Sequence, residues 1–199
     1  MSVKQLMRIV RRDRRYYDNS RGGVTITGGE PLYQCRFTQE LLKACKAESI
    51  HTAIETCGLA SWECLESILP HLDLLFYDIK HSDANQHREF TGQSNELILS
   101  NLARATSLFD HGEIVVRVPF VPGKNDDERT LKEIFETVCN LQHITRVELM
   151  PYHRFGMAKY SGLGRRYDLS ALEPVHKHEL EDVKKLGESF GVEVRIDST

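Results

Sequence analysis

Ionisable residues stand at the ends of several short β-rich runs of this sequence. They are Glu30 behind Gly28 and Gly29, Glu55 beside Thr56, Asp78 with Lys80, Arg117, and His153. In a parallel α/β architecture the carboxyl ends of the strands meet at one edge, where binding sites form. Carboxylates accept hydrogen bonds from an ammonium group, and a lysine binds a carboxylate. Charges of both signs at one edge therefore predict a polar pocket for a charged, zwitterionic ligand.

Each of these residues taken alone also has a simpler explanation. Asp78 and Lys80 lie on one face of their run, because side chains alternate along a strand, and they can form a surface ion pair. Arg117 can be a rim residue, and His153 an ordinary loop residue. The string GGEP can be a tight turn, although two residues without Cβ also let a ligand approach the backbone and allow a positive φ. The prediction of a pocket depends on all of them occurring together.

Runs rich in β-branched residues alternate with longer amphipathic segments along the chain. The predicted strands are 24–27, 51–55, 72–79, 113–118, 146–150 and 192–196. The predicted helices are 3–13, 38–48, 62–69, 96–109, 126–140 and 172–190. This alternation predicts an α/β fold with a parallel sheet, either open or curled into a partial (β/α) barrel of about five to six βα units.

Length and composition limit the classes of protein to which this chain can belong. With 199 residues, 40% of them hydrophobic, we expect a single domain over residues 1–199. A net charge of -3 and a pI near 6.3 give no basic field for nucleic acid. No apolar run approaches the roughly 18 residues of a membrane span, and the first residues lack the apolar core of a signal peptide. We therefore expect a cytoplasmic protein without membrane contact.

The five cysteines, at positions 35, 45, 57, 64 and 139, form no recognisable framework. Their number is odd and their spacing is irregular, so we expect reduced thiols in a reducing compartment. They form no CxxxCxxC cluster. The sequence therefore predicts no metal ligand, and no residue is assigned a catalytic role.

Five motifs together resemble one enzyme family. They are GGEP at 28–31, ETCG at 55–58, YDIK at 77–80, RVPFVPGKND at 117–126 and LMPYHRFGMAKYSGLG at 149–164. In order and spacing they resemble the radical S-adenosylmethionine (SAM) enzymes that activate glycyl radical enzymes, the pyruvate formate-lyase activating enzyme family. The likeness extends from about residue 22 to the C-terminus. It implies a partial barrel of the radical SAM type.

The resemblance also implies that the predicted pocket binds SAM. The residues that it assigns to cofactor binding are Gly28, Gly29, Glu30, Glu55, Thr56, Asp78, Ile79, Lys80, Arg117 and His153. The GGE motif is expected to hold the amino group of the methionine half, and Lys80 to lie near its carboxylate. Glu55 and Thr56, together with Asp78, are expected to surround a monovalent cation. Arg117 belongs to the pocket, and His153 is expected to contact the cofactor near the ribose and sulfonium.

The sequence departs from this family in one respect. Radical SAM chemistry uses a [4Fe-4S] cluster held by a CxxxCxxC motif, which this sequence does not contain. We therefore expect a radical SAM core fragment that lacks the first strand and the cluster loop and is inactive alone. For the intact enzyme, the resemblance implies a glycyl radical enzyme as protein substrate and a flavodoxin or ferredoxin as electron donor.

Two alternative functions stay open at this point. The chain can be a non-catalytic domain that binds SAM or the protein partner, or it can belong to another radical SAM subfamily, such as the anaerobic ribonucleotide reductase activases. A phosphate-binding barrel is disfavoured, because the sequence contains neither a GxGxxG motif nor a P-loop.

Overall fold

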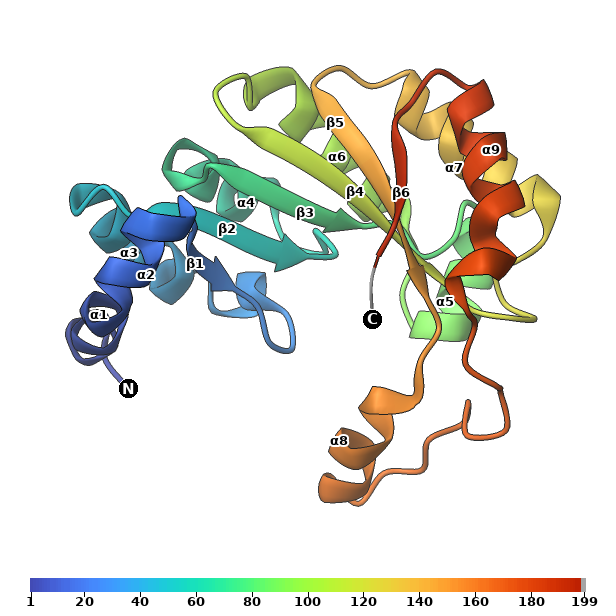
Figure 1. Cartoon of the computed structure of the whole chain (residues 1–199), viewed down its shortest axis with the longest axis horizontal. Coiled ribbons are helices and arrows are strands. Elements are labelled where there is room, and N and C mark those ends of the chain that lie inside the picture. The colour runs from blue at the N-terminus through green and yellow to red at the C-terminus, as the bar shows by residue number, and fades with distance from the viewer. Residues whose placement is uncertain (198–199) are drawn as a thin grey trace.

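A parallel sheet of six strands runs through residues 1–197, the part of the chain that the computed structural model describes (Figure 1). The strands lie in chain order, and each pairs in parallel with the next. They are β1 Gly23–Ile26, β2 His51–Thr56, β3 Leu74–Asp78, β4 Glu113–Phe120, β5 Ile144–Pro151 and β6 Val194–Ile196. The predicted α/β fold is confirmed, and within this described part β1 and β6 are the edge strands.

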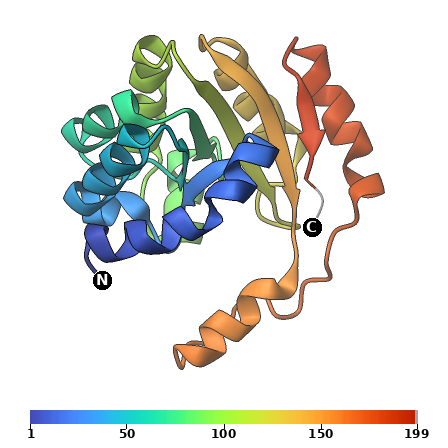
Figure 2. The same cartoon turned by 60° about the vertical axis from the view of Figure 1, so that its left-hand side comes forward.

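Helices connect the strands and follow the outer side of the curved sheet, whereas α8 extends away from it (Figures 1 and 2). The α-helices are α1 Val3–Val10, α2 Arg14–Ser20, α3 Cys35–Ala47, α4 Trp62–Ile68, α5 Ala84–Thr91, α6 Glu96–Leu108, α7 Glu128–Cys139, α8 Met157–Gly162 and α9 Glu181–Ser189. The 3₁₀ helices are η1 Arg11–Asp13, η2 Pro31–Gln34, η3 Leu69–His71, η4 Arg154–Gly156 and η5 Lys177–Leu180. Within residues 1–197 no helix is both long and apolar enough to cross a bilayer.

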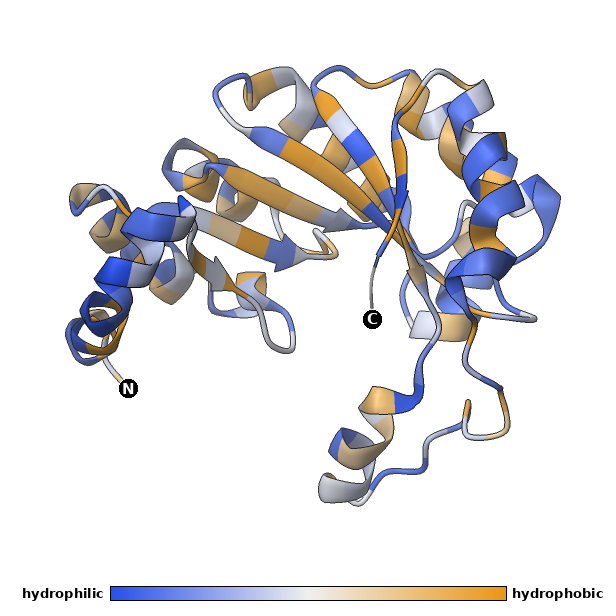
Figure 3. Cartoon of the chain, in the orientation of Figure 1, coloured by the Kyte–Doolittle hydropathy of each residue, from blue (hydrophilic) through white to orange (hydrophobic). Residues whose placement is uncertain are grey.

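Alternation along the strands separates a fully buried side of the sheet from a half-buried inner side. On β3, Leu75 and Tyr77 are completely buried, whereas Phe76 and Asp78 are half-buried. Tyr77 reaches α6, where its hydroxyl donates to the carbonyl of Ile98 at 2.7 Å. The apolar core therefore lies between the sheet and the helices, and the hydrophobic bands of the central strands are visible in Figure 3. Polar side chains collect on the opposite, inner side.

The last predicted helix, 172–190, is wrong over its first part. Residues 172–176 are not helical, and the helical turns begin at Lys177. Pro174 has no N–H to donate and disfavours a helical conformation in the residue before it. The hydrophobic pattern also does not reveal α5, because its sequence ANQHREFT is almost wholly polar, nor α8, which spans only six residues. In the chain, α5 follows β3, and α8 follows β5 through η4.

The expectation of five reduced thiols is wrong for two of them. A disulfide joins Cys35, the first residue of α3, to Cys64 in α4. The two residues are 29 positions apart, and the packing of α3 against α4 brings their Cα atoms to 5.9 Å. Cys45, Cys57 and Cys139 are free thiols. The contact between two helices, which no local pattern records, decides this pairing.

Candidate functional site

The register of the sheet sets charged residues beside one another at the carboxyl ends of the strands. Asp78 on β3 pairs in register with Arg117 on β4. Glu55 on β2 pairs with Phe76, which precedes Asp78 by two positions on β3. Because residues two apart share a face, all four side chains lie on the inner side of the sheet. The register thus places one arginine beside two carboxylates.

Arg117 shares its guanidinium between these two carboxylates. Its Nε and Nη2 donate to Oδ1 of Asp78 at 3.0 and 2.9 Å, and its Nη1 lies 3.2 Å from Oε1 of Glu55. Burial opposes the positive charge, but the two carboxylates outweigh this effect, so the pKa of the guanidinium is raised. Arg117 therefore stays charged. It lies between the carboxylates to which the resemblance assigned a monovalent cation, and that cation stays a prediction.

Glu30 has both carboxylate oxygens hydrogen-bonded by the chain itself. Oε1 accepts from the backbone N–H of Leu32 at 3.0 Å and from the hydroxyl of Thr56 at 2.6 Å. Oε2 accepts from the backbone N–H and the thiol of Cys57 at 3.0 and 3.1 Å. A carboxylate offers about four lone-pair positions, so an ammonium group reaches Glu30 only by displacing one of these donors. The thiol is the weakest donor among them.

Thr27 and Cys57 also belong to the site, although the sequence analysis did not single them out. The Thr27 hydroxyl donates to Oε2 of Glu55 at 2.8 Å. Burial is the main cause that raises the pKa of the Cys57 thiol, and the Glu30 carboxylate adds to it, so the thiol keeps its proton and donates. Thr27 directly precedes Gly28, and Cys57 directly follows Thr56. This adjacency to predicted site residues is the one feature of the sequence that could have indicated them.

A small cavity of about 190 Å³ lies among these side chains. It is lined by Thr27, Gly28, Gly29, Glu30, Glu55, Thr56, Cys57, Asp78, Lys80 and Arg117. Two predicted residues are not brought into it. Ile79 is 2% exposed and packs in the apolar core, and His153 lies beyond β5, where its Nδ1 accepts from the N–H of Phe155 at 3.2 Å. Pockets for whole drug-sized ligands take roughly 300 Å³ or more, so this cavity suits only the methionine end of SAM.

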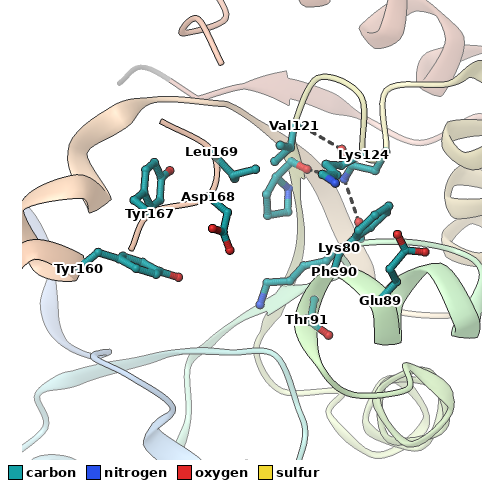
Figure 4. A pocket seen from close by; sticks show the side chains of 12 residues that line it. Lys80, Glu89, Phe90, Thr91, Val121, Lys124, Tyr160, Tyr167, Asp168 and Leu169 are labelled. Carbon is teal, nitrogen blue, oxygen red and sulfur yellow. Dashed lines mark hydrogen bonds between the residues drawn. The ribbon is translucent and has the colours of Figure 1, made fainter. Parts of the chain in front are cut away.

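A second cavity, of about 400 Å³, adjoins the small one at Lys80 (Figure 4). Tyr160, Tyr167 and Asp168 line its far side, and the Lys80 side chain extends toward them (Figure 4). The Lys80 side chain is 40% exposed, and its Nζ lies 3.8 Å from Oδ2 of Asp78. Lys80 is therefore held only loosely by its counter-ion and lines both cavities.

The described residues do not fit an iron–sulfur cluster. Across residues 1–197, no group of three or more His, Cys, Asp or Glu side chains is arranged to hold a metal ion. Cys35 and Cys64 are bonded to each other, Cys45 is buried, and Cys139 is exposed near the end of α7. No chemical step is therefore assigned to a cluster on these residues.

Residues 152–170 form an arm that projects from the sheet and contains η4 and α8 (Figures 1 and 2). Its base is held together by hydrogen bonds, because the hydroxyl of Tyr152 donates to the carbonyl of Leu169 at 2.8 Å and accepts from Tyr167 at 3.1 Å. Its surface presents large apolar side chains, including Phe155 at 72% and Leu163 at 69% exposure. A concentration of exposed apolar side chains is typical of an interaction surface.

Comparison with known proteins identifies the family of this chain. Residues 1–134 match the family model described as the Radical SAM superfamily. The chain is 39% identical over 186 residues to the choline trimethylamine-lyase activating enzyme of Oleidesulfovibrio alaskensis. This alignment covers 92% of this chain and 59% of that protein. It is 36% identical over 185 residues to the 4-hydroxyphenylacetate decarboxylase activating enzyme of Clostridioides difficile, with 93% and 58% covered. The chain thus spans somewhat more than half the length of these relatives.

Solved structures agree with this assignment. A domain of a pyruvate-formate lyase-activating enzyme from Bacteroides vulgatus superposes with a TM-score of 0.73 at 28% identity, over 89% of this chain and 99% of that one. Streptococcus suis SuiB bound to S-adenosylmethionine superposes with a TM-score of 0.69 at 17% identity, over 100% of this chain and 44% of that one. The second likeness concerns the fold alone.

Proposed function

Because the chain belongs to the radical SAM superfamily, we propose that its small cavity binds the methionine end of S-adenosylmethionine. The chain is then the cofactor-binding part of an enzyme that activates a glycyl radical enzyme. The names of its relatives support this extension, since activating enzymes for two lyases, a decarboxylase and a dehydratase are 34–41% identical to it over the aligned residues.

The charge balance of the small cavity is the observation that carries this proposal. Its lining contains three carboxylates, Glu30, Glu55 and Asp78, and two cations, Lys80 and Arg117, which leaves one net negative formal charge. SAM carries an ammonium, a sulfonium and a carboxylate group, so its net charge is positive and complementary. When bound, it supplies a sulfonium whose carbon–sulfur bond is the bond to be broken.

The chain's own residues bind and orient the methionine end. Lys80 binds the carboxylate as a point charge. Gly28 has a φ of 139°. Apart from the residues next to each glycine in the chain, no atom lies within 4 Å of the place that a Cβ would occupy at Gly28 or Gly29, so an amino group can approach the backbone. Glu30, braced by Thr56 and Cys57, holds this glycine turn against the end of β2.

Several assignments stay predictions within this proposal. They are the contact of His153 with the ribose and sulfonium, a role for Ile79, the monovalent cation, and the flavodoxin or ferredoxin donor. The alternative of a non-catalytic SAM-binding domain is favoured for the chain by itself, because the residues described here do not fit a cluster. Radical chemistry then requires ligands from outside residues 1–197.

Titration of the chain with SAM, followed by NMR, tests the proposed site. We expect weak binding, with a Kd of about 100 µM or higher, because no cluster iron contributes a contact. The Lys80→Ala substitution should weaken binding about tenfold by removing the cation for the carboxylate. Lys46→Ala is the control, because Lys46 has a similar exposure, 37%, and pairs with Asp73 at the other end of β3. Equal losses in the two variants would contradict the proposal.

The arm of residues 152–170 supports a protein as the substrate. It lies at the carboxyl end of β5, beside the larger cavity, so a partner docked on it faces the candidate site. Its exposed apolar side chains are accompanied by the basic residues Lys159, Arg165 and Arg166. This combination fits a partner surface that is apolar and acidic.

Substitution on the arm tests this docking surface. The double variant Phe155→Ser/Leu163→Ser should weaken binding to a cognate glycyl radical enzyme at least tenfold, because it removes two exposed apolar anchors. The probes are the four enzymes named by the relatives: choline trimethylamine-lyase, isethionate sulfite-lyase, (2S)-3-sulfopropanediol dehydratase and 4-hydroxyphenylacetate decarboxylase. Leu97→Ser/Leu108→Ser on α6 is the control, since these leucines are 45% and 55% exposed away from the arm. Binding that survives the arm variant would rule out this surface.

A further inference from the structure

One buried amide joins the ends of β3 and β4 next to the candidate site. Asn125 is 3% exposed. Its Nδ2 donates to the carbonyl of Lys80 at 2.8 Å and to the carbonyl of Pro119 at 2.6 Å, and its Oδ1 accepts from the N–H of Val121 at 2.8 Å. Both amide hydrogens and the amide oxygen are thus engaged with the backbone. A buried side chain with this set of contacts defines the path of the segments that it joins.

Lys80 is the residue that most needs such support. Lys80 lies two residues beyond the end of β3. Between them, the N–H of Ile79 still donates a hydrogen bond to the carbonyl of Arg117 on β4, at 2.9 Å. Beyond this point the Lys80 backbone is tied through its carbonyl to Asn125. Among residues 1–197, the one ion pair of the Lys80 side chain is the 3.8 Å contact to Asp78. The side chain lines both cavities, and Figure 4 shows it in the larger one. The direction of the side chain therefore depends on how the backbone is held.

We propose that Asn125 is a positioning residue for SAM binding: by clamping the Lys80 carbonyl to the loop after β4, it keeps the Lys80 side chain at the boundary between the two cavities, within reach of a ligand in the small one. The expected effect on SAM binding rests on the proposed function, whereas the hydrogen bonds that Asn125 makes do not. The clamp acts on the same pair of neighbouring strands that supply Asp78 and Arg117, so it keeps the cation in register with the carboxylates around it.

Asn95 supplies a matched comparison. It is also 3% exposed, and its Nδ2 donates at 2.8 Å to the carbonyls of His81 and Ser82, which follow Lys80 directly. It therefore holds the same loop by the same chemistry, one residue further on and without touching Lys80. Loss of either amide should destabilise the loop by a similar amount. Only loss of Asn125 should release the Lys80 backbone.

NMR of the chain after reductive ¹³C-methylation of its lysines tests the clamp without any ligand. Methylation keeps the lysine charge, and Lys80→Arg identifies the Lys80 signal. In Asn125→Asp at pH 8 the introduced carboxylate faces two carbonyl oxygens, so the Lys80 signal should move to the position of freely exposed lysines. In Asn95→Asp it should stay where it is. A Lys80 signal unchanged in folded Asn125→Asp would overturn the proposal.

The pH dependence of the Lys80 signal distinguishes loss of the Asn125 hydrogen bonds from a general loss of stability. Burial disfavours the charged form of the introduced carboxyl, and its protonated form can again donate one hydrogen bond. The Lys80 signal of Asn125→Asp should therefore return toward its wild-type position as the pH falls, whereas that of Asn95→Asp should not respond. If Asn125→Asp does not fold, Asn125→Ser serves instead, since it removes the bridge without adding charge. An unmoved Lys80 signal in that variant equally overturns the proposal.

A SAM titration of the same variants separates this inference from the proposed function. At pH 8, Asn125→Asp should bind SAM about tenfold more weakly than wild type, because one charged hydrogen bond to the ligand is misplaced. The SAM affinity of Asn95→Asp should stay within about twofold of wild type. If the wild-type chain binds no SAM, the proposed function fails while the methyl-lysine signals still decide whether the clamp exists. If wild type and Asn125→Asp bind equally, the clamp has no role in binding and the proposal is overturned.

Discussion

The Gly58→Ala substitution should lower the free energy of unfolding by about 4 kcal/mol, because overpacking adds to the cost of a left-handed conformation. Gly58 has a φ of 69°, and a Cβ there would overlap the hydroxyl and the ring of Tyr77. Tyr77 is completely buried and tied to the carbonyl of Ile98, so it has no room to withdraw. The overlap can only be relieved by moving the loop after β2.

That movement should also damage the candidate site. The N–H of Gly58 donates to the hydroxyl of Thr56 at 2.9 Å, and that hydroxyl donates to Glu30. Gly92→Ala is the control, because Gly92 has a φ of 84° but a Cβ added there would meet nothing within 4 Å beyond its chain neighbours. This substitution should lower the free energy of unfolding by only about 1 kcal/mol. Urea unfolding followed by the fluorescence of Trp62 measures both. Equal losses would mean that the contact with Tyr77 is unimportant.

The Arg117→Met substitution should lower the free energy of unfolding by about 3 kcal/mol and abolish detectable SAM binding. Arg117 is only 13% exposed in its side chain and is the shared partner of Asp78 and Glu55. Removing it takes the shared counter-ion from two partly buried carboxylates and leaves Asp78 with the longer 3.8 Å contact to Lys80, which costs more than the loss of a surface ion pair. Urea unfolding and the NMR titration with SAM measure the two effects.

Arg146→Met is the matched control for this prediction. Arg146 on β5 is 15% exposed in its side chain and pairs with Glu148 at 2.8 Å and with Glu113 at 3.4 Å, but it does not line the small cavity. It should reduce stability as well, by about 2 kcal/mol, while leaving SAM binding within about twofold of wild type. If both variants lose binding to the same degree, the effect of Arg117 arises from stability and the assignment of this residue to the site is wrong.

Most of the candidate site could be predicted from the sequence because it depends on two local rules. Side chains alternate along a strand, and parallel strands linked by helices end at one edge. These rules are sufficient to associate Asp78 and Lys80 with Arg117 and Glu55 from the sequence. The same alternation places Ile79 on the opposite face, where its side chain packs in the core. Its role in cofactor binding came from the resemblance and stays a prediction.

The sequence by itself determined the alternation of strands and helices, the family and the charged residues at the strand ends, because these follow from periodicity and from motifs along the chain. Only the tertiary structure decided that Glu30 is occupied by Thr56 and Cys57, that Cys35 meets Cys64, and that His153 stands apart from the small cavity. Such distances depend on how separate helices and loops pack against the sheet. Packing is a property of the whole assembled core, and no local stretch of sequence encodes it.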